Sequence, residues 1–101
     1  MIVRLWRGWT RPADADAYQA FLEAEIAHGF LDLEGVLGVE VLRDDLEGET
    51  AFVTVIRFED AAALEAFAGP DLEAAVVPEP AQGLLSRWDE RVAHYRVAVS
   101  R

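Results

Sequence analysis

The sequence predicts an α+β domain built around an antiparallel β-sheet, and three observations support this fold class. Residues 50–58 form a run without Gly or Pro that has apolar side chains on both parities, which is typical of an inner strand covered on both faces. Strand-like alternation changes to helical periodicity twice along the chain. A polar turn at residues 44–48 joins two strand-like segments, which must therefore be antiparallel neighbours.

The first strand is predicted at residues 2–10, and a helix follows it from Asp14 to about Leu33. Either Asp14 or Asp16 is expected to cap the exposed amides at the start of this helix. Gly29 is expected to break or bend the last turn. The helix presents one apolar stripe, which comprises Tyr18, Phe21, Leu22, Ile26, Gly29 and Leu33.

The rest of the chain continues with segments of both types. A second helix is expected to begin at the cap residue Asp60 and to end at Gly69-Pro70. Pro78 and Pro80 are expected to hold an extended loop. The remaining predicted segments are a strand at 35–42, the strand at 50–58, a further helical turn at 71–76, one more turn at 81–86 and a last strand at 91–99.

The order strand, helix, strand, strand, helix, strand is that of the ferredoxin-like βαββαβ fold. Short connections and right-handed crossovers place the first and third strands in the middle of a four-stranded antiparallel sheet, with both helices on one face. The other face would expose more large apolar side chains than a monomer normally does. We therefore expect a homodimer closed face to face. The alternative is a monomer whose Pro-rich segment folds over that face.

Length and composition limit the chain to a single domain, residues 1–101. The chain has 9 Lys plus Arg, all of them Arg, against 19 Asp plus Glu, and the net charge of −10 repels phosphate backbones and anionic lipids. We therefore expect neither nucleic acid nor membrane as a partner. The N-terminus lacks the features of a secretory signal, and no run approaches ~18 apolar residues, so the expected location is the cytoplasm.

Five stretches, spread over nearly the whole chain, form a recognisable set. They are the opening Ile-Val-Arg-Leu-Trp-Arg-Gly, the helix that carries Tyr18, the strand end Val41–Arg43, the run Phe67–Val76 and the late His94-Tyr95. Together they resemble small proteins of the antibiotic biosynthesis monooxygenase-like superfamily. The resemblance implies a dimeric α/β barrel, in which the sheets of two subunits form a barrel with the helices outside. It also implies a pocket between sheet and helices in each subunit.

The activities in this superfamily differ. Some members oxidise aromatic polyketides without a metal or organic cofactor, some degrade heme, and many have no established role. In the heme-degrading branch the resemblance places a proximal His in the segment matching residues 71–76 and an Asn near Trp6 or Arg7, and this chain matches neither. The quinone-forming branch uses Trp with Asn or Tyr around the substrate, and no such set aligns clearly here.

Glu25 lies near the centre of the apolar stripe of the first helix, at 100° per residue on a helical wheel. A carboxylate there would be desolvated, which would raise its pKa and suit it to accept a proton from an aromatic phenol. Two other interpretations stay open. Glu25 either forms a salt bridge with a strand arginine, or is turned toward solvent. The arginines considered are Arg4, Arg7 and Arg57.

His94 is the one histidine on a predicted strand, and it supports two interpretations. As a proton shuttle it would have a suitable pKa, near the ordinary value of about 6.5. As a structural residue it would form a hydrogen bond across the sheet or the dimer interface. His28, at the edge of the helical stripe, is expected to be a surface or rim residue.

A set of aromatic and basic residues is predicted to bind a planar ligand. Aromatic side chains would supply flat walls, although each is also expected as an ordinary core or interface residue. The predicted ligand-binding residues are Trp6, Arg7, Tyr18, Phe21, Arg43 and Trp88. The chain has no Cys, its two His are far apart, and it contains no phosphate-binding loop or dinucleotide motif. We therefore expect no metal and no cofactor.

These features support a small cytoplasmic homodimer that binds a small apolar or aromatic molecule and acts as a cofactor-independent monooxygenase. Direct attack by O2 requires the substrate to be held as an electron-rich anion. The protein would then supply a base, Glu25 or His94, and an arginine for the developing oxyanion, Arg7 or Arg43. The alternative is a non-enzymatic dimer that sequesters a ligand or serves as an accessory subunit, because the fold supports both roles.

Overall fold

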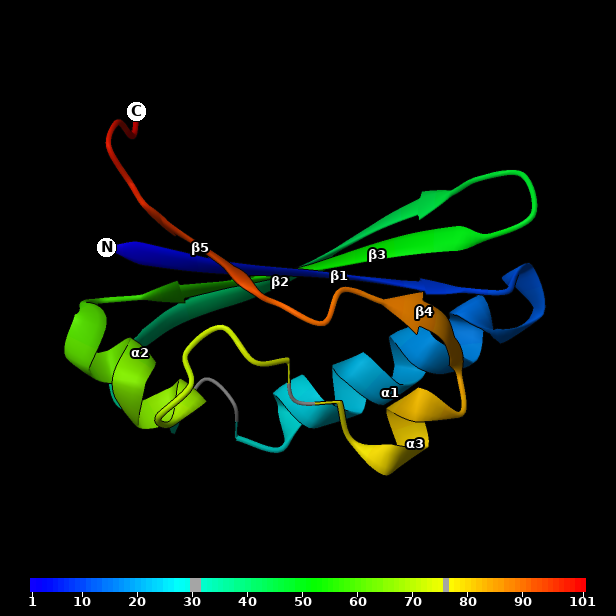
Figure 1. Cartoon of the computed structure of the whole chain (residues 1–101), viewed down its shortest axis with the longest axis horizontal. Coiled ribbons are helices and arrows are strands. Elements are labelled where there is room, and N and C mark those ends of the chain that lie inside the picture. Colours follow the sequence, from blue (N-terminus) through cyan, green and yellow to red (C-terminus); the bar gives the residue numbers. More distant parts are fainter. Residues whose placement is uncertain (30–31, 76) are drawn as a thin grey trace.

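The computed structural model describes residues 1–29, 32–75 and 77–101. Five strands and three α-helices follow one another along these residues, with a short 3-10 helix after the first strand (Figure 1). The elements are β1 (Ile2–Thr10), η1 (Pro12–Asp14), α1 (Ala15–Ala27), β2 (Val36–Asp45), β3 (Thr50–Phe58), α2 (Ala61–Ala68), α3 (Glu79–Gln82), β4 (Leu85–Trp88) and β5 (Ala93–Arg96).

The strands form one antiparallel sheet in the order β2-β3-β1-β4, and β5 also pairs with β1. The predicted ferredoxin-like α+β fold is confirmed, and β1 and β3 occupy the middle of the sheet as predicted. The number of strands differs from the prediction of four. The fourth position is divided between β4 and β5, which pair with opposite halves of β1. The helices all lie on one side of the sheet (Figure 1).

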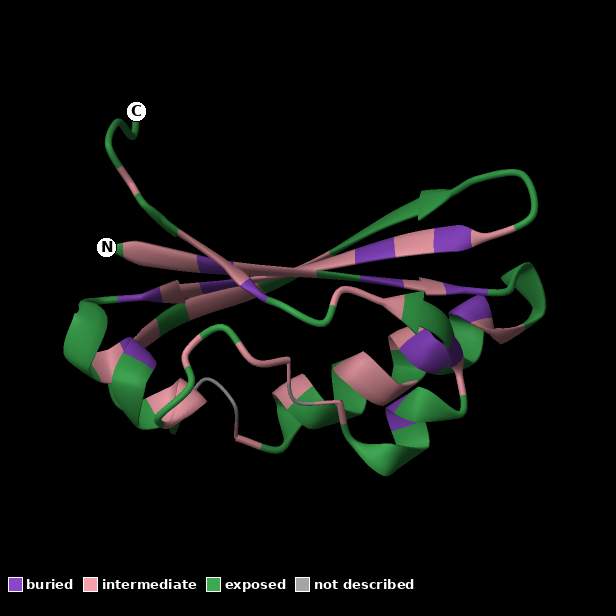
Figure 2. Ribbon diagram, viewed as in Figure 1, coloured by how far each residue is buried: buried purple, intermediate pink, exposed green. Residues whose placement is uncertain are grey.

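The side of β3 that faces the helices contains several of the buried residues of the sheet. Phe52, Ile56 and Phe58 are 1%, 6% and 0% exposed (Figure 2). Phe52 packs in one core cluster with Tyr18 of α1, and Ile56 and Phe58 pack in a second cluster with Leu64 of α2. Strand β3 thus has the predicted bounds, and its helix-facing side chains form the core.

The first helix departs from its prediction at both ends. Helix α1 ends at Ala27, and Gly29 has a φ of 106°, a left-handed conformation that favours glycine. Leu33 is therefore outside the helix and 46% exposed, and residues 30 and 31 lie outside the described residues. Asp14 occupies the N-cap position as predicted, but its side chain makes no cap hydrogen bond, so the predicted capping of the amides is wrong. The Asp14 carboxylate accepts from Arg11, and Asp16 pairs with Arg43.

The second helix is confirmed at both ends. The Asp60 side chain accepts a hydrogen bond from the Ala63 amide at 2.9 Å, which satisfies an exposed donor of the first turn of α2. Gly69 follows the last residue of the helix with a φ of 77°, a conformation that a residue with a side chain rarely adopts.

Residues 71–82 differ from the prediction. The segment expected as a helical turn at 71–76 contains a single turn, in which the Ala74 amide donates to the Asp71 carbonyl. Ala74 then pairs with Arg91 in an isolated bridge, and Val76 lies outside the described residues. The predicted Pro-rich loop contains the short helix α3. Proline is tolerated in the first turn of a helix because the amide it lacks would have no partner there.

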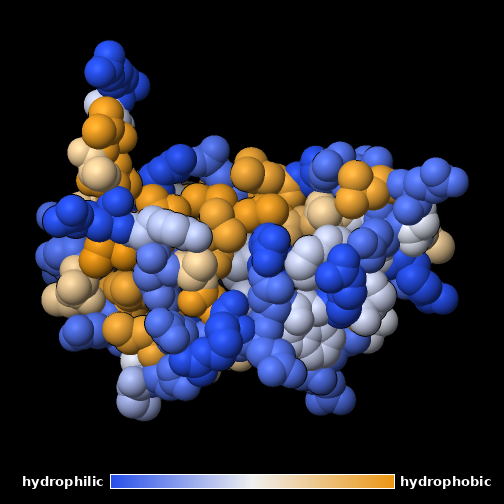
Figure 3. Space-filling model, turned by 45° about the horizontal axis from the view of Figure 1, so that its top comes forward, coloured by the Kyte–Doolittle hydropathy of each residue, from blue (hydrophilic) through white to orange (hydrophobic). Residues whose placement is uncertain are grey.

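The second face of the sheet, called the bare face below, has no helix over it (Figure 1). It is formed by the alternate residues of each strand that point away from the helices. In Figure 3, hydrophobic side chains gather in a band across it. Leu42 and Tyr95 on this face are 49% and 59% exposed. Its members include Val3, Leu5, Arg7 and Trp9 of β1, Ala51, Val53, Val55 and Arg57 of β3, Leu42 of β2 and Tyr95 of β5.

No helix among the described residues is long and apolar enough to cross a membrane.

Candidate ligand pocket

A cavity of about 340 Å³ lies between the helix-facing side of the sheet and the segments that cover it. This volume is at the lower end of the range for ligand pockets, ~300–1,000 Å³. Its wall is largely apolar and includes one buried arginine and one carboxylate. The lining residues are Arg4, Trp6, Tyr18, Phe21, Leu22, Glu25, Thr54, Ile56, Phe67, Ala68, Ala75, Val77, Pro78, Ala81 and Val92.

Three of the predicted aromatic ligand-binding residues line this cavity. Trp6 points from β1, and its indole Nε1 donates to the Asp89 carbonyl at 2.6 Å, which fixes the ring. Tyr18 and Phe21 come from α1 and stack with their ring centroids 6.4 Å apart. These rings give the pocket the flat walls that the sequence predicted.

Tyr18 is 1% exposed, yet its hydroxyl has no hydrogen-bond partner among the described residues. Burial raises the pKa of Tyr18 to about 12, so the hydroxyl stays protonated at neutral pH. The ring meets Phe52 edge to face, with the centroids 4.9 Å apart. Tyr18 therefore presents a neutral O–H group to the pocket from a fixed ring.

Glu25 lines the same cavity from α1 but is exposed to solvent. The expectation of a desolvated carboxylate is therefore wrong, and no arginine among the described residues forms an ion pair with it. The open alternative, in which the helix turns Glu25 toward solvent, describes its position. Glu25 therefore lies at the rim of the pocket, whereas Phe21 and Leu22 of the same helix are partly buried in its wall.

His94 does not line the cavity. It lies on β5 opposite Arg4 of β1, and its Nε2 accepts from the Arg4 Nη1 at 2.9 Å. Since an arginine can only donate, this bond requires the neutral imidazole with its proton on Nδ1. Burial, together with the nearby positive charge of Arg4, lowers the pKa of His94 from its usual value. The cross-sheet hydrogen bond is the structural role considered for His94 from the sequence.

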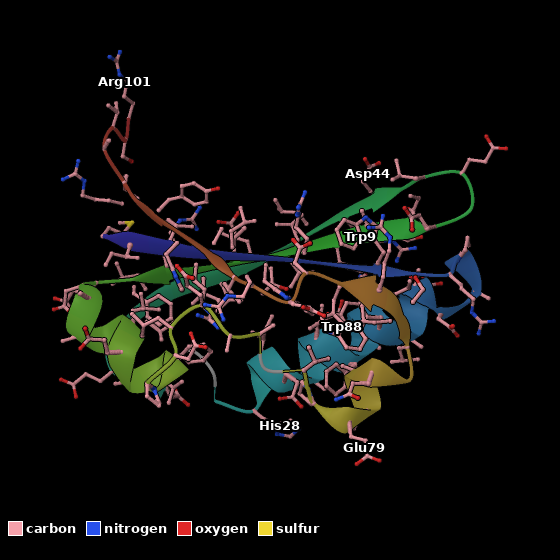
Figure 4. The ribbon with its side chains drawn as sticks, in the orientation of Figure 1. Trp9, His28, Asp44, Glu79, Trp88 and Arg101 are labelled. Atoms are coloured by element: carbon pink, nitrogen blue, oxygen red, sulfur yellow. The ribbon has the colours of Figure 1, made fainter. Side chains whose placement is uncertain are left out.

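Arg7, Arg43 and Trp88 also lie outside the pocket wall. Arg7 is on the bare face and pairs with Asp89 at 2.8 Å, while Arg43 pairs with Asp16 and Asp45. Trp88 lies on the helix side of the sheet, whereas Trp9 lies on the bare face (Figure 4). Trp88 packs against the core cluster of Tyr18 and Phe52. The sequence predicted these residues from their side-chain type and their strands, but it did not determine whether each side chain would face the pocket.

Arg4 was not identified from the sequence as a residue of the pocket wall. It lies on the helix-facing side of β1, in the pocket wall, and is 6% exposed. Its Nη1 donates to the Leu72 carbonyl at 2.6 Å, and its guanidinium lies over the Phe67 ring at 5.5 Å from the centroid. A usable signal was present in the sequence, because Arg4 shares the parity of Ile2 and Trp6 on an inner strand.

A family model for antibiotic biosynthesis monooxygenases matches residues 1–79. The chain belongs to this family. The matched residues include β1, α1, β3 and α2, which supply most of the pocket wall, and they end before β5 and His94. Among proteins with curated functions, none matches the chain significantly.

Solved structures of low sequence identity share the fold of this antibiotic biosynthesis monooxygenase family member. A proposed antibiotic biosynthesis monooxygenase from Bacillus cereus has a TM-score of 0.69 at 16% identity, over 100% of this chain and 94% of that one. A second from Deinococcus radiodurans gives 0.66 at 16%, over 100% and 96%. The heme-degrader MhuD from Mycobacterium tuberculosis, solved with two hemes in its active site, gives 0.56 at 22%, over 100% and 99%.

The described part of this family member contains no group of three or more His, Cys, Asp or Glu placed to hold a metal ion. Neither histidine is in the pocket wall, since His28 is exposed just beyond α1 and His94 bonds to Arg4. The pocket offers apolar contact, a neutral hydroxyl, a buried positive charge and a carboxylate at the rim. These groups suit a small organic molecule with one polar end.

Proposed function

We propose that this family member binds a small aromatic molecule in the pocket and oxidises it with O2, without a metal or organic cofactor. The main support is the cavity itself, in which the aromatic rings of Trp6, Tyr18 and Phe21 surround a space that also has a carboxylate, Glu25, at its rim. Membership in the antibiotic biosynthesis monooxygenase family supports the oxidation.

The reaction that we assign converts an acidic CH2 carbon of a phenolic ring system to a carbonyl. Loss of a proton from this carbon gives an electron-rich anion, which forms a C–O bond with O2. Cleavage of the O–O bond, with loss of the second hydrogen from the carbon, leaves the carbonyl and releases water. CH2 and O2 thus become C=O and H2O, and the substrate itself supplies the electrons, so no reductant is consumed.

Glu25 is the proposed proton acceptor, because it is the one carboxylate in the pocket wall among the described residues. Its contact with solvent gives the proton a route away from the pocket. The apolar walls exclude water from the anion, which strengthens every electrostatic contact made to it. His94 contributes indirectly in this proposal, since it accepts from Arg4 rather than facing the cavity.

We also propose that two copies of the chain pack bare face against bare face. Val53 and Val55 lie on a central strand with apolar side chains on both faces. Helices cover only one face of the sheet among the described residues (Figure 1). Large exposed apolar areas on a small domain usually mark an interface, and a two-fold contact would cover the same patch on each copy.

A second function, ligand sequestration without turnover, is favoured by two observations. The proposed base Glu25 is exposed instead of buried, and His94 lies outside the pocket wall. In that case the aromatic walls alone would account for the pocket.

The test is to incubate the protein with dithranol, a dihydroxyanthrone, in buffer containing isotopically labelled O2. For the enzyme we expect the anthraquinone to form faster than without protein and to carry one labelled oxygen. Glu25→Gln should slow this reaction at least ~10-fold, since general bases contribute ~10²–10⁴. Glu23→Gln is the matched control, because Glu23 is exposed on the same helix and lies outside the pocket wall.

Native mass spectrometry of the same samples separates the two functions. Bound dithranol with only the protein-free rate of oxidation would favour sequestration. Turnover that Glu25→Gln leaves unchanged would remove Glu25 from the mechanism. If dithranol is neither bound nor oxidised by the protein, both functions are contradicted.

A further inference from the structure

We propose that Arg4 forms an anion-binding subsite in the pocket, so that the ligand is a small aromatic molecule carrying one anionic oxygen group. This inference rests on the proposed function, since it requires the pocket to hold a ligand. It adds the chemical class of that ligand and the residue that recognises its charge.

Arg4 is set apart from the other arginines by its surroundings. Six of the chain's 9 basic residues pair with a carboxylate, namely Arg7, Arg11, Arg43, Arg57, Arg87 and Arg91. Arg96 and Arg101 are exposed near the C-terminus. Arg4 is 6% exposed, and among the described residues no carboxylate forms an ion pair with it. Although the sequence has 19 acidic residues, the part of the chain that the structure describes gives this buried guanidinium no carboxylate partner.

The protein groups that contact Arg4 are neutral. They are the carbonyls of Leu72 and Ala74, the Nε2 of His94 and the Phe67 ring. Carbonyls and a neutral imidazole satisfy donors but do not cancel a charge, and a buried charge without a partner is costly. Burial lowers the pKa of Arg4 from its usual value, which reflects this cost. An anionic ligand would offset it.

The guanidinium also retains donors for a ligand. Arginine has five N–H groups, and the contacts to the protein occupy both on Nη1 and one on Nη2, the latter at a long 3.4 Å. The Nε–H and the second Nη2–H have no partner among the described residues. Two adjacent N–H groups match the two oxygens of a carboxylate, or the single oxygen of a phenolate.

The other polar groups of the pocket are compatible with this arrangement. The Tyr18 hydroxyl, protonated and without a partner among the described residues, can donate a further hydrogen bond to the same ligand. Glu25 is at the exposed rim, where its charge is screened by solvent. An aromatic acid can therefore place its ring against Trp6 and Phe21 while its oxygen reaches Arg4.

A purely structural role for Arg4 makes a different prediction. As a clamp, Arg4 would only hold residues 72–74 against β1 through the two carbonyls. A clamp would have no preference for ligand charge. Ligand selectivity in the wild-type protein therefore distinguishes the two roles without any substitution that risks unfolding.

The experiment compares naphthoate with the matching neutral naphthamide by isothermal titration calorimetry. We expect the wild-type protein to bind naphthoate at least ~10-fold more tightly, in line with charge-assisted hydrogen bonds. Arg4→Met should abolish this preference, and Arg4→Lys should retain part of it. Arg7→Met is the matched control, because Arg7 lies on the same strand but on the bare face, and it should leave the preference unchanged.

Each outcome has a distinct meaning. Equal binding of both probes by the wild type overturns the anion subsite and leaves the pocket function standing. A preference that survives in a folded Arg4→Met variant places the recognition elsewhere and also overturns it. If the wild type binds neither probe, this inference is overturned, and the dithranol experiment decides separately whether the pocket function stands.

Discussion

Arg4 and Arg7 are three residues apart on β1 and therefore point to opposite faces of the sheet. Arg7, on the bare face, has a side chain that is 55% exposed and pairs with Asp89 at 2.8 Å. Arg4, on the helix side, is 6% exposed, and its hydrogen-bond partners among the described residues are neutral. The same residue type thus serves a surface ion pair on one face and lines a pocket on the other.

The difference shows that the two faces of the sheet have different roles in this small domain. The helix side provides the core and, between its two clusters, the space for a ligand. The bare face exposes apolar side chains that contribute little to the fold of a single copy. Substitutions on the helix side should therefore change stability and ligand binding, whereas those on the bare face should change self-association.

The largest effect is expected for Phe58→Ala. Phe58 is 0% exposed and packs against Phe67 with the ring centroids 5.5 Å apart. Removing a buried aromatic side chain should lower the free energy of unfolding by ~3–5 kcal/mol, because it loses burial and leaves a cavity. Urea unfolding followed by circular dichroism measures this change.

Leu46→Ala is the control for Phe58→Ala. Leu46 is 45% exposed in the hairpin turn after β2, away from both the core and the centre of the bare face. We expect a change within ~0.5 kcal/mol. Similar losses for the two variants would contradict the assignment of the core to the helix side.

The second effect tests the bare face. Val55 is three residues from Phe58 on β3 and lies on this face opposite Leu5. Val55→Arg would place a charge at the centre of the proposed dimer contact and should weaken self-association by at least ~10-fold, which is about 1.4 kcal/mol. Sedimentation velocity should show the wild type at twice the chain mass of 11.2 kDa and the variant shifted toward the single chain.

Leu46→Arg provides a matched control, since it adds the same charge outside the bare face and should leave the dimer intact. A wild-type protein that sediments as a single chain at micromolar concentration would refute the dimer. A Val55→Arg variant that stays dimeric would move the interface to another surface.

The smallest effect concerns His94 and pH. Because the folded state holds the pKa of His94 below its usual value, the unfolded chain binds the proton first as the pH falls. The contribution of His94 to stability is thus fully present above about pH 6.5, its ordinary pKa, and is lost progressively below it. His94→Gln should show a weaker dependence of the unfolding free energy on pH between about 6.5 and 5.

Between about pH 6.5 and 5, the effect of His94 on stability can be separated from the effects of the carboxylates. The lowered pKa values of Asp45, Glu49 and Asp71, each caused mainly by an arginine partner, affect stability only at more acid pH. His28→Gln is the control, because His28 is exposed and bonds through its backbone to the Ala24 carbonyl. A slope that is the same in the wild type and in His94→Gln would contradict the bond to Arg4 as a source of stability.

The local elements could be predicted because their signals are short in range. The bounds of β3, the Asp60 cap and the turn at Gly69 depend on residues within a few positions of one another. The turn predicted at 71–76 is limited to one hydrogen-bonded turn from Asp71 to Ala74, because Ala74 then pairs with Arg91 in a non-local bridge. Strand β4 was not predicted, since the sequence indicated a turn at 81–86, and β5 is shorter than the strand predicted at 91–99. Both strands depend on pairing with a distant partner, β1.

The candidate site was only partly predictable for the same reason. Trp6, Tyr18 and Phe21 were found because apolar periodicity identifies the buried side of a strand or helix. Arg7, Arg43 and Trp88 were expected at the site but lie outside the pocket wall, where packing and ion pairs place them. Glu25 was expected to be desolvated but lies at the exposed rim of the pocket. Helical periodicity identifies the apolar face of α1, but it does not give the position of the helix axis relative to the sheet.

The sequence by itself determined the order of the main elements from β1 to α2 and the presence of two apolar faces on the central strands, since periodicity and capping are local properties of the chain. Only the tertiary structure decided what surrounds Arg4. Its hydrogen-bond partners Leu72 and His94 are 68 and 90 positions away, and no local pattern connects them. Bringing these groups together buries a positive charge without a countercharge, and that arrangement exists only once the sheet and its covering segments have packed.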